Sequence, residues 1–490
     1  MKIHLIVLAV AAVCCAGCKV KQTYNMPVAP VPAAYQNTAS EAQASAVAKG
    51  WVTASPADAQ PKNPWWKIYG DPLLNTLETR VDADNQSLKA AVSRFTEARA
   101  LVRATRSQRL PVFSAGGDVM RARESMNQGV PPPASESDFN DFKAGLSASW
   151  EPDLWGRIGT MINASVQQAQ ANAADLENMR LSLHAELAYD YLTLRSLDNE
   201  RKVLQDSVAV YAKAFKMMED RYQGGLANRA DVEQARTQLE AASAQEADIS
   251  NNRMLYLHAI ALLTGQLPEG FSIPEAPQAM TPPDVPTGVP SELLERRPDV
   301  AAAERRVAAA NSQIGLARSA FYPQVILSGA IGMDSKNIGT WYDAPSRYWA
   351  VGPVLAQTIF DGGRRRAELA KAVASYDESI ADYRQNVLTA FQQVEDNLAS
   401  LKILSEEAAR QKRAVDAARS AEELAMNRYQ GGMVTYLDVI STQSTLLQNE
   451  RIAVSIERRR MEASVALVRA LGGGWSAHSL PQAEDVETGK

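Results

Sequence analysis

The sequence has few cysteines and no internal run of apolar residues long enough for a membrane helix. Its 490 residues include only three cysteines, Cys14, Cys15 and Cys18, all near the amino terminus. A mature chain that begins at Cys18 keeps a single thiol, which excludes an internal disulfide. Beyond the first residues, no stretch approaches the ~20 apolar residues that a transmembrane helix needs. If the mature protein spans a membrane, it must therefore do so with strands.

Residues that carry catalytic or metal chemistry are also sparse. The four histidines are scattered, and no pair has the spacing of a metal site. No Ser/His/Asp or Cys/His arrangement indicates a nucleophile. The formal net charge is −5, and no basic block is present that would neutralise a run of phosphates. We expect no enzyme activity, no metal, no cofactor and no nucleic-acid partner.

The amino terminus has the layout of a secretory signal, with a short basic start and an apolar core over residues 1–17. Ala16-Gly17-Cys18 resembles a bacterial lipobox, which predicts cleavage before Cys18 and a lipid on its sulfur. Lys19 is not the aspartate that resembles an inner-membrane retention signal, so the outer membrane is favoured. The alternative is ordinary signal cleavage nearby, with Cys18 incidental.

An internal repeat organises the remaining chain. The sequence Arg-Tyr-Gln-Gly-Gly occurs at 221–225 and again at 428–432, an offset of 207 residues. The same offset relates Gly156-Arg157 to Gly363-Arg364, Asp231-Val232 to Asp438-Val439, and Gly265 to Gly472. We therefore predict a first repeat at 71–267, a Pro-rich linker at 268–290, a second repeat at 291–472 and a tail at 473–490.

Each repeat is predicted to hold one helix, a β-hairpin and two long antiparallel helices. Apolar residues step by four and three through the long segments, as at Leu204, Val208, Tyr211, Phe215 and Met218. The predicted long helices cover 157–223, 226–265, 364–430 and 433–471, and the first of each pair would run roughly 95 Å. A free-standing antiparallel coiled coil with no channel would show the same helix pattern.

The segments between the helices alternate as barrel strands do. Lys143, Gly145 and Ser147 share one face, and Leu146 and Trp150 share the other. Hairpins at about 111–152 and 323–360 supply four strands per chain, whose edges must pair with other copies. Two chains would make eight strands with a filled interior, and three would make twelve with an aqueous bore. A small water-soluble sheet is the alternative.

Several motifs resemble the outer membrane efflux protein family, in its TolC-like lipoprotein branch of the OprM and NodT type. They are Trp65-Trp66 before Asp71-Pro72-Leu73, the run Leu294-Glu295-Arg296-Arg297-Pro298-Asp299-Val300, and Phe321-Tyr322-Pro323. The resemblance implies a mainly α fold with a membrane β-barrel portion. It implies a homotrimer whose 12-stranded outer-membrane barrel continues into a long periplasmic α-helical barrel, with a collar that includes residues 18–70.

The resemblance also suggests functional residues. It places Gly224, Gly225, Gly431 and Gly432 at the periplasmic tip, where left-handed glycines end the long helices and a periplasmic adaptor makes contact. They are equally well explained as helix caps alone.

A gate is implied beside the second tip. Tyr429 falls on the family's tethering tyrosine, and Leu437 on its apolar constriction. The family often has an aspartate at the position of Ser441, so the nearby Asp438 is the candidate carboxylate of the gate. Its counterpart Asp231 instead favours a structural role for Asp438.

The implied partners are two further copies of the chain, the adaptor, outer-membrane lipid and an inner-membrane efflux pump of the RND type. The expected function is passive export of small molecules such as drugs. The alternative is a lipid-anchored periplasmic coiled-coil scaffold without a pore.

Overall fold

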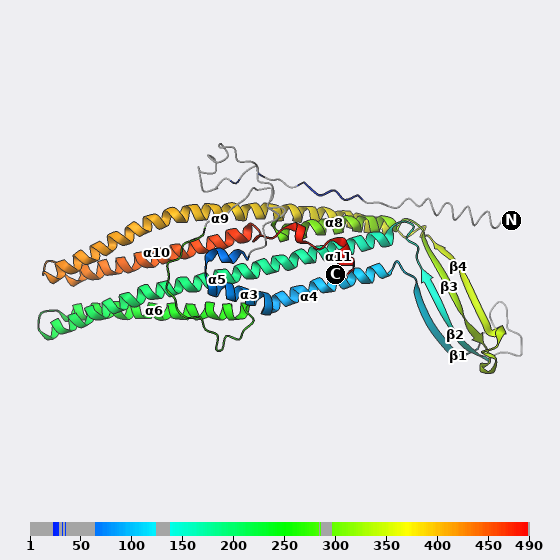
Figure 1. Ribbon diagram of the computed structural model, residues 1–490, viewed down its shortest axis with the longest axis horizontal. Helices are drawn as coiled ribbons and strands as arrows, with labels where there is room; N and C mark the ends of the chain where they lie inside the picture. Colours follow the sequence, from blue (N-terminus) through cyan, green and yellow to red (C-terminus); the bar gives the residue numbers. More distant parts are fainter. Residues whose placement is uncertain are drawn as a thin grey trace.

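The computed structural model describes residues 23–28, 32, 35, 64–123, 138–283, 285 and 296–488. The molecule is elongated, with a β-sheet at one end and the tips of two helical hairpins at the other (Figure 1). Its elements are η1 (Trp65–Tyr69), α3 (Pro72–Asp84), α4 (Gln86–Ser107), β1 (Val112–Arg123), β2 (Asp138–Trp150), α5 (Arg157–Gln223), α6 (Arg229–Leu263), α8 (Pro298–Ser319), β3 (Gln324–Ser335), η3 (Ile338–Thr340), η4 (Ala344–Ser346), β4 (Arg347–Ala356), α9 (Arg364–Gln430), α10 (Tyr436–Ala470), η5 (Ala477–Ser479) and α11 (Ala483–Thr488).

The long helices α5 and α9 have 67 residues each, and α6 and α10 have 35 each. The bounds of α9 and α10 lie 207 residues beyond those of α5 and α6, so the sequence repeat is a structural one. The helices α6 and α10 begin three residues later than the sequence predicts. Asn228 and Thr435 are their N-caps, because each forms a capping box with the aspartate three residues further on.

The long helices pack laterally through apolar positions spaced by four and three, as the sequence predicts for α5. Leu204 and Met218 are fully buried in α5, and Val387 and Val394 are fully buried in α9. None of the described helices is long and apolar enough to cross a membrane.

The short helices α4 and α8 stack end to end on α6 and α10. Asn85 Nδ2 donates to Leu263 O at 2.8 Å in the first repeat, and Arg297 Nη1 donates to Ala470 O at 3.0 Å in the second. Each joint is tight because a glycine follows the end of α6 or α10, where no side chain separates the two helices. A Cβ on Gly265 would lie 2.6 Å from the carbonyl oxygen of Asp84, and one on Gly472 would lie 2.0 Å from that of Arg296.

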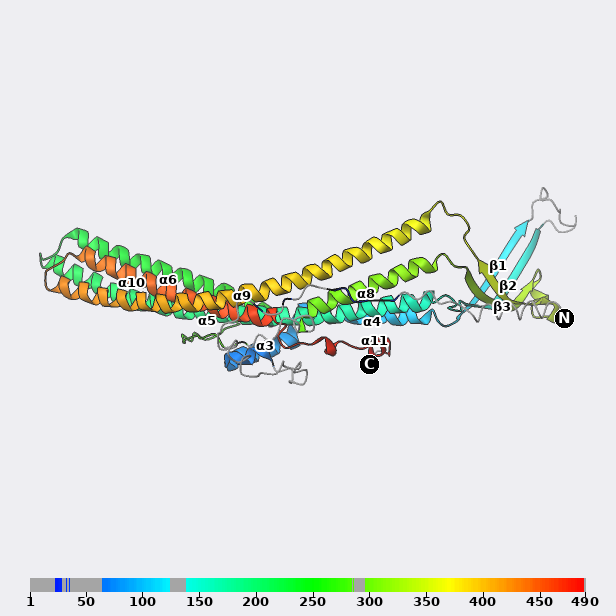
Figure 2. The same cartoon turned by 90° about the horizontal axis from the view of Figure 1, so that it is seen from above.

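Smaller elements lie beside the middle of the long helices. Figure 2 shows α3 and α11 on one side of them. Leu74, Leu77 and Val81 of α3 share a core with Leu187 and other residues of α5, and Val486 of α11 is buried in a second core. We call η1, α3, α11 and the segment that follows α6 the collar. Near the other repeat, Tyr24 Oη donates to Glu304 Oε1 at 2.6 Å, which holds the amino-terminal segment against α8.

The four strands form one antiparallel sheet in the order β1-β2-β3-β4. The register sets two unlike faces. One carries exposed apolar side chains such as Phe113, Leu146, Ile331 and Trp349. The other carries Lys143 and smaller or polar residues. Among the described residues, β1 and β4 each leave one edge unpaired.

Substitution of Gly472 by alanine should destabilise the joint between α10 and α8. Its φ is +89°, and the new Cβ would collide with the carbonyl oxygen of Arg296. Gly474 has a φ of +83° but no atom within 4 Å of such a Cβ, so Gly474→Ala is the matched control. We expect Gly474→Ala to lower the free energy of unfolding by about 1–2 kcal/mol and Gly472→Ala by clearly more. Equal losses in denaturant titrations of the two purified variants would contradict the close contact.

Candidate functional site at the helix tips and collar

The two helix tips lie at the end of the molecule farthest from the sheet (Figure 1). All four predicted tip glycines are exposed. Gly224 and Gly431 have φ of −78°, whereas Gly225 and Gly432 have φ of +72°. The prediction of left-handed geometry for both glycines of each pair is therefore wrong for the first. A helix-ending turn of this kind places one residue in the left-handed region, and that residue is the second glycine.

Tyr429 joins the two tips. Its hydroxyl donates to Met218 Sδ at 3.4 Å, and its ring lies 5.4 Å from that of Tyr436. The guanidinium of Arg221 lies 5.2 Å above the same ring. Met218 and Tyr436 are buried in one apolar cluster with residues of α5, α6 and α10. This geometry holds the end of α9 against the end of α5.

Leu437 and Ser441 are one helical turn apart on α10, and both are exposed in the single chain. Asp438, by contrast, has partners. Its Oδ2 accepts hydrogen bonds from the Thr435 backbone N at 3.0 Å and from Thr435 Oγ1 at 2.8 Å. The equivalent Asp231 caps α6 through the backbone N of Asn228. This arrangement favours the structural role for Asp438, because its carboxylate is occupied at the helix start. Cys18 and the signal segment lie outside the described residues.

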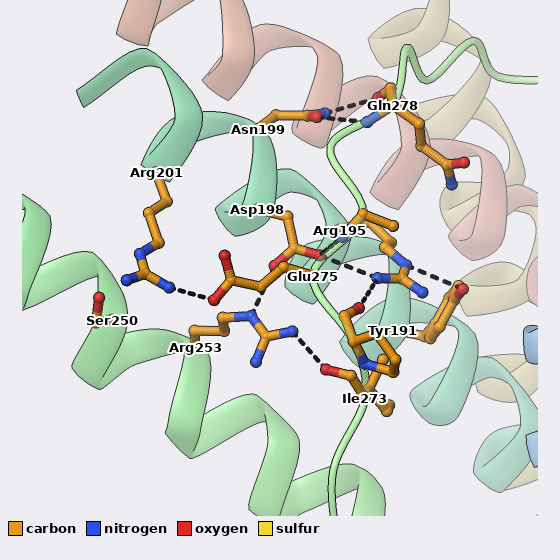
Figure 3. A network of polar contacts seen from close by, with 12 residues as sticks. Tyr191, Arg195, Asp198, Asn199, Arg201, Ser250, Arg253, Ile273, Glu275 and Gln278 are labelled. Atoms are coloured by element: carbon orange, nitrogen blue, oxygen red, sulfur yellow. Dashed lines mark hydrogen bonds and ion pairs between the residues drawn. The ribbon is translucent and has the colours of Figure 1, made fainter. Parts of the chain in front are cut away.

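A buried ionic network at the collar escaped the sequence analysis (Figure 3). Asp198 of α5 accepts hydrogen bonds from Arg195 Nη1 at 3.0 Å and from Arg253 Nε of α6 at 2.6 Å. Its side chain is fully buried, and that of Arg195 is 5% exposed. Arg195 Nε also donates to Tyr191 Oη at 3.0 Å, and Tyr191 Oη donates to Asp71 Oδ2 at 2.5 Å. Because Asp71 is the N-cap of α3, the network ties the start of α3 to α5 and α6.

The same network fastens the segment that follows α6. The two arginines donate to the carbonyl oxygens of Ile273 at 2.8 Å and Pro274 at 2.7 Å, and the backbone N of Ala276 donates to the buried aspartate at 3.1 Å. Asn199 and Gln278 exchange a further pair of hydrogen bonds, which Figure 3 also shows. The collar segment is therefore held through its backbone.

The described part of the second repeat lacks the central aspartate of this network. The positions 207 residues beyond its tyrosine and aspartate hold Leu398 and Ser405, whereas the equivalents of its two arginines are still basic, Lys402 and Arg460. A buried aspartate inside an apolar heptad pattern, without an acidic counterpart in the other copy, was the signal that the sequence offered.

His184 forms a second polar cluster between α5 and the collar. Its Nδ1 lies 2.6 Å from Glu78 Oε2, its Nε2 lies 3.3 Å from Asp82 Oδ1, and its ring stacks on Trp66 at 4.3 Å. Burial alone would lower the pKa of His184, but its hydrogen bonds to Asp82 and Glu78 outweigh burial and raise that pKa to about 9. Burial raises the pKa of Glu78 to about 7 against the opposing effect of His184. A cationic histidine thus clamps α3 and η1 onto α5.

The sequence pattern of the outer membrane efflux protein family matches residues 79–266 and 289–473, which is most of the chain in two copies. The chain belongs to this family. The gap between the two matches falls on the Pro-rich segment that joins the repeats.

Curated relatives extend the match to nearly full length. The pyoverdine export outer membrane protein OpmQ of Pseudomonas aeruginosa is 31% identical over 87% of this chain and 90% of that protein. The outer membrane protein OprJ of the same organism is 30% identical over 94% of this chain and 93% of that protein. The toluene efflux pump outer membrane protein TtgF of Pseudomonas putida is 30% identical over 97% of this chain and 98% of that protein.

Solved structures share the fold. The outer-membrane channel OprN matches 92% of this chain and 98% of its own with a TM-score of 0.81 and 29% identity. The outer membrane protein VceC of Vibrio cholerae matches 84% of this chain and 99% of its own, with a TM-score of 0.78 and 29% identity. The chain is thus the outer-membrane channel component of an efflux system and extends from the outer membrane into the periplasm.

Removal of the Asp198 carboxylate should destabilise the collar strongly. Asp198→Ala leaves two buried arginines without their counter-charge, which costs about 3–5 kcal/mol in comparable sites. Asp206, whose pair with Lys202 is exposed on the same helix, is the matched control, and Asp206→Ala should cost less than about 1 kcal/mol. The measurement is the free energy of unfolding of the purified mature variants. A loss for Asp198→Ala no larger than the control's would show that the network does not hold the collar.

The His184 cluster should make stability fall as pH rises. A histidine with a raised pKa stabilises the fold fully below its unfolded pKa of 6.5 and loses this contribution as pH rises through about 9. Glu78 acts in the same direction between 4.5 and about 7. The thermal midpoint of the wild type should therefore fall between pH 6.5 and 9, and His184→Gln should flatten this part of the profile. His258→Gln removes an exposed histidine of α6 and should keep the wild-type slope. A slope unchanged in His184→Gln would refute the clamp.

Proposed function

We propose that three copies of the chain close one twelve-stranded barrel in the outer membrane and one helical tube below it, and so form a passive export duct. The observation that carries this proposal is the four-stranded sheet, with two open edges and two unlike faces. Unpaired strand edges are not tolerated in hydrocarbon, so β1 of one copy pairs with β4 of the next. Three copies leave an aqueous bore, whereas two would fill it with side chains.

The apolar face of the sheet supports a lipid environment. Phe113, Trp349 and Val351 are 78%, 75% and 76% exposed in the single chain. A patch of this kind on a water-soluble protein marks a surface that another apolar phase covers. The scaffold alternative leaves this face without a role. A lipid on Cys18 would add an anchor to the same membrane.

The periplasmic end would hold the gate. Tyr429 keeps the end of α9 on α5, and the exposed Leu437 and Ser441 point away from the packed side of α10. Three copies of Leu437 would then narrow the bore, and Asp438 would act through the cap of α10. The exposed glycine turns leave backbone open to the hairpins of an adaptor, which would connect the duct to an inner-membrane pump of the RND type. The cargo would be small molecules such as drugs.

Single-channel conductance of the purified mature protein in planar bilayers tests the duct. We expect small or rare openings for the wild type and larger or more frequent ones for Leu437→Ala, because the apolar constriction is shortened. Asp438→Ala should also loosen the tip, since loss of a cap costs about 1 kcal/mol. Leu226→Ala makes the same change in the exposed turn of the first tip and should leave conductance unchanged. Absence of conductance from every well-folded preparation would favour the scaffold.

A further inference from the structure

A tyrosine lies flat over glycines in the middle of the sheet. The register places Gly116, Gly145, Gly332 and Tyr348 side by side on the four strands. A Cβ on Gly145 would lie 2.6 Å from Tyr348 Oη, and one on Gly332 would lie 2.8 Å from Tyr348 Cε1. The ring therefore occupies the space that two missing side chains leave free. This ring and the close backbone oxygens of Ile331 and Ala144 together explain why glycines stand at both positions of otherwise regular strands.

The next row on the same face is charged. Asp118, Lys143 and Asp334 are neighbours in register on β1, β2 and β3. Lys143 Nζ lies 3.5 Å from Asp334 Oδ2 and 5.1 Å from the centroid of the Tyr348 ring. The lysine thus links the charged row to the aromatic one, through an ion pair and a cation–π contact. Two aspartates and one lysine leave this row with a net charge of −1 in each copy.

Both rows lie on the face that would line the bore. Lys143 and Gly145 alternate along β2 with Leu146 and Ala144, which belong to the apolar face. The two rows lie in the middle part of the sheet, and the charged row is the farther of the two from the helices, because Lys143 precedes Gly145 along β2, which ends at Trp150 before α5. In the assembled duct they would stand between the outside and the rest of the barrel.

We infer that Tyr348 and the Asp118–Lys143–Asp334 row form a charge-selective constriction inside the barrel, separate from the gate at the helix tips. The inference rests on the proposed three-copy barrel. Three tyrosine rings reduce the open area at this level, and the surrounding row presents a net negative charge to any solute that passes. Cationic solutes therefore pass this level more readily than anionic ones of the same size. Lys143 moderates the preference, because its charge offsets one aspartate of its own row.

The test uses a cysteine placed behind the constriction and reached from outside the cell. Ser147→Cys lies on the bore face, one row further toward the helices than Gly145. Intact cells are treated with a cationic and an anionic methanethiosulfonate of similar size, and the wild type provides the background from Cys18. Because the reagents enter from outside, the state of the periplasmic tip does not limit the rate. We expect the cationic reagent to react faster, on the order of tenfold.

Substitutions in the cysteine background then assign the effect. Tyr348→Ala should speed the reaction of both reagents, and Lys143→Gln should raise the ratio of cationic to anionic rates, since it doubles the net negative charge of the row. Tyr342→Ala and Lys336→Gln make the same chemical changes in the turn between β3 and β4 and should alter neither quantity. The inference would be overturned if the reaction rate at Ser147→Cys were the same for both reagents and did not change with the Tyr348 and Lys143 substitutions.

A cysteine on the opposite face separates this result from failure of the barrel itself. Ala148→Cys lies on the apolar face and should be protected by lipid from both charged reagents. If Ala148→Cys reacted as fast as Ser147→Cys, the sheet would not stand in a membrane, and the proposed function would fail together with the constriction. If Ala148→Cys were protected but the rate at Ser147→Cys did not depend on reagent charge or on the substitutions, only the constriction would be rejected.

Discussion

Lateral packing along one unbroken helix is the constraint on which the rest of the molecule depends. Helix α5 runs for 67 residues, and α3, α4, α6, α8, α10 and α11 all pack against it. Most of the stability of a helix in a protein comes from tertiary packing of its apolar face, so the apolar positions of α5 must be covered at every level. From Ile158 to Asp198 it is buried on several sides, whereas beyond Leu204 its buried residues follow a single seam. The collar lies at the level where this change occurs.

The two repeats share their helix lengths and their turns but differ at the collar. The first copy holds its collar segments with buried charges, around Asp198 and around His184. The second copy has Ser405 and Phe391 at the corresponding positions, and Phe391 lies in an apolar core. The two repeats therefore share the frame of the helices, whereas the polar clusters around Asp198 and His184 belong to the first copy. Buried charges of this kind contribute to geometry more than to stability, because desolvation offsets much of their attraction.

Much of the architecture follows from the sequence because it is periodic. The offset of 207 residues and the four-and-three spacing predict the long helices, and alternation through Lys143 and Leu146 predicts the two faces of the sheet. The starts of α6 and α10 were missed because three residues after each glycine pair belong to the turn and cap rather than to the helix. Which glycine of a pair adopts the left-handed conformation depends on backbone hydrogen bonds at the helix end, and the sequence alone does not show these.

The candidate site was less accessible to sequence reasoning. Tyr429 was found through a resemblance, but its contacts with Met218 and Arg221 join residues of different repeats, and no local pattern reveals such pairs. The role of Asp438 was ambiguous because an aspartate can serve either in a helix cap or as a pore carboxylate. Its hydrogen bonds with Thr435, which the sequence does not reveal, favour the cap. The partners in the Asp198 network could not be predicted for the same reason, since they come from three separate segments of the chain.

The stacked joints at Gly265 and Gly472 have a mechanical consequence. Of the four helical columns in each copy, two are continuous and two are divided at the height of the collar. A divided column carries load along its axis, but it lacks the continuous ladder of backbone hydrogen bonds that makes a helix stiff against bending. At that height the bending stiffness of the wall therefore depends on α5 and α9, and the collar lies against the helices at the level where two of the four columns are divided (Figure 2).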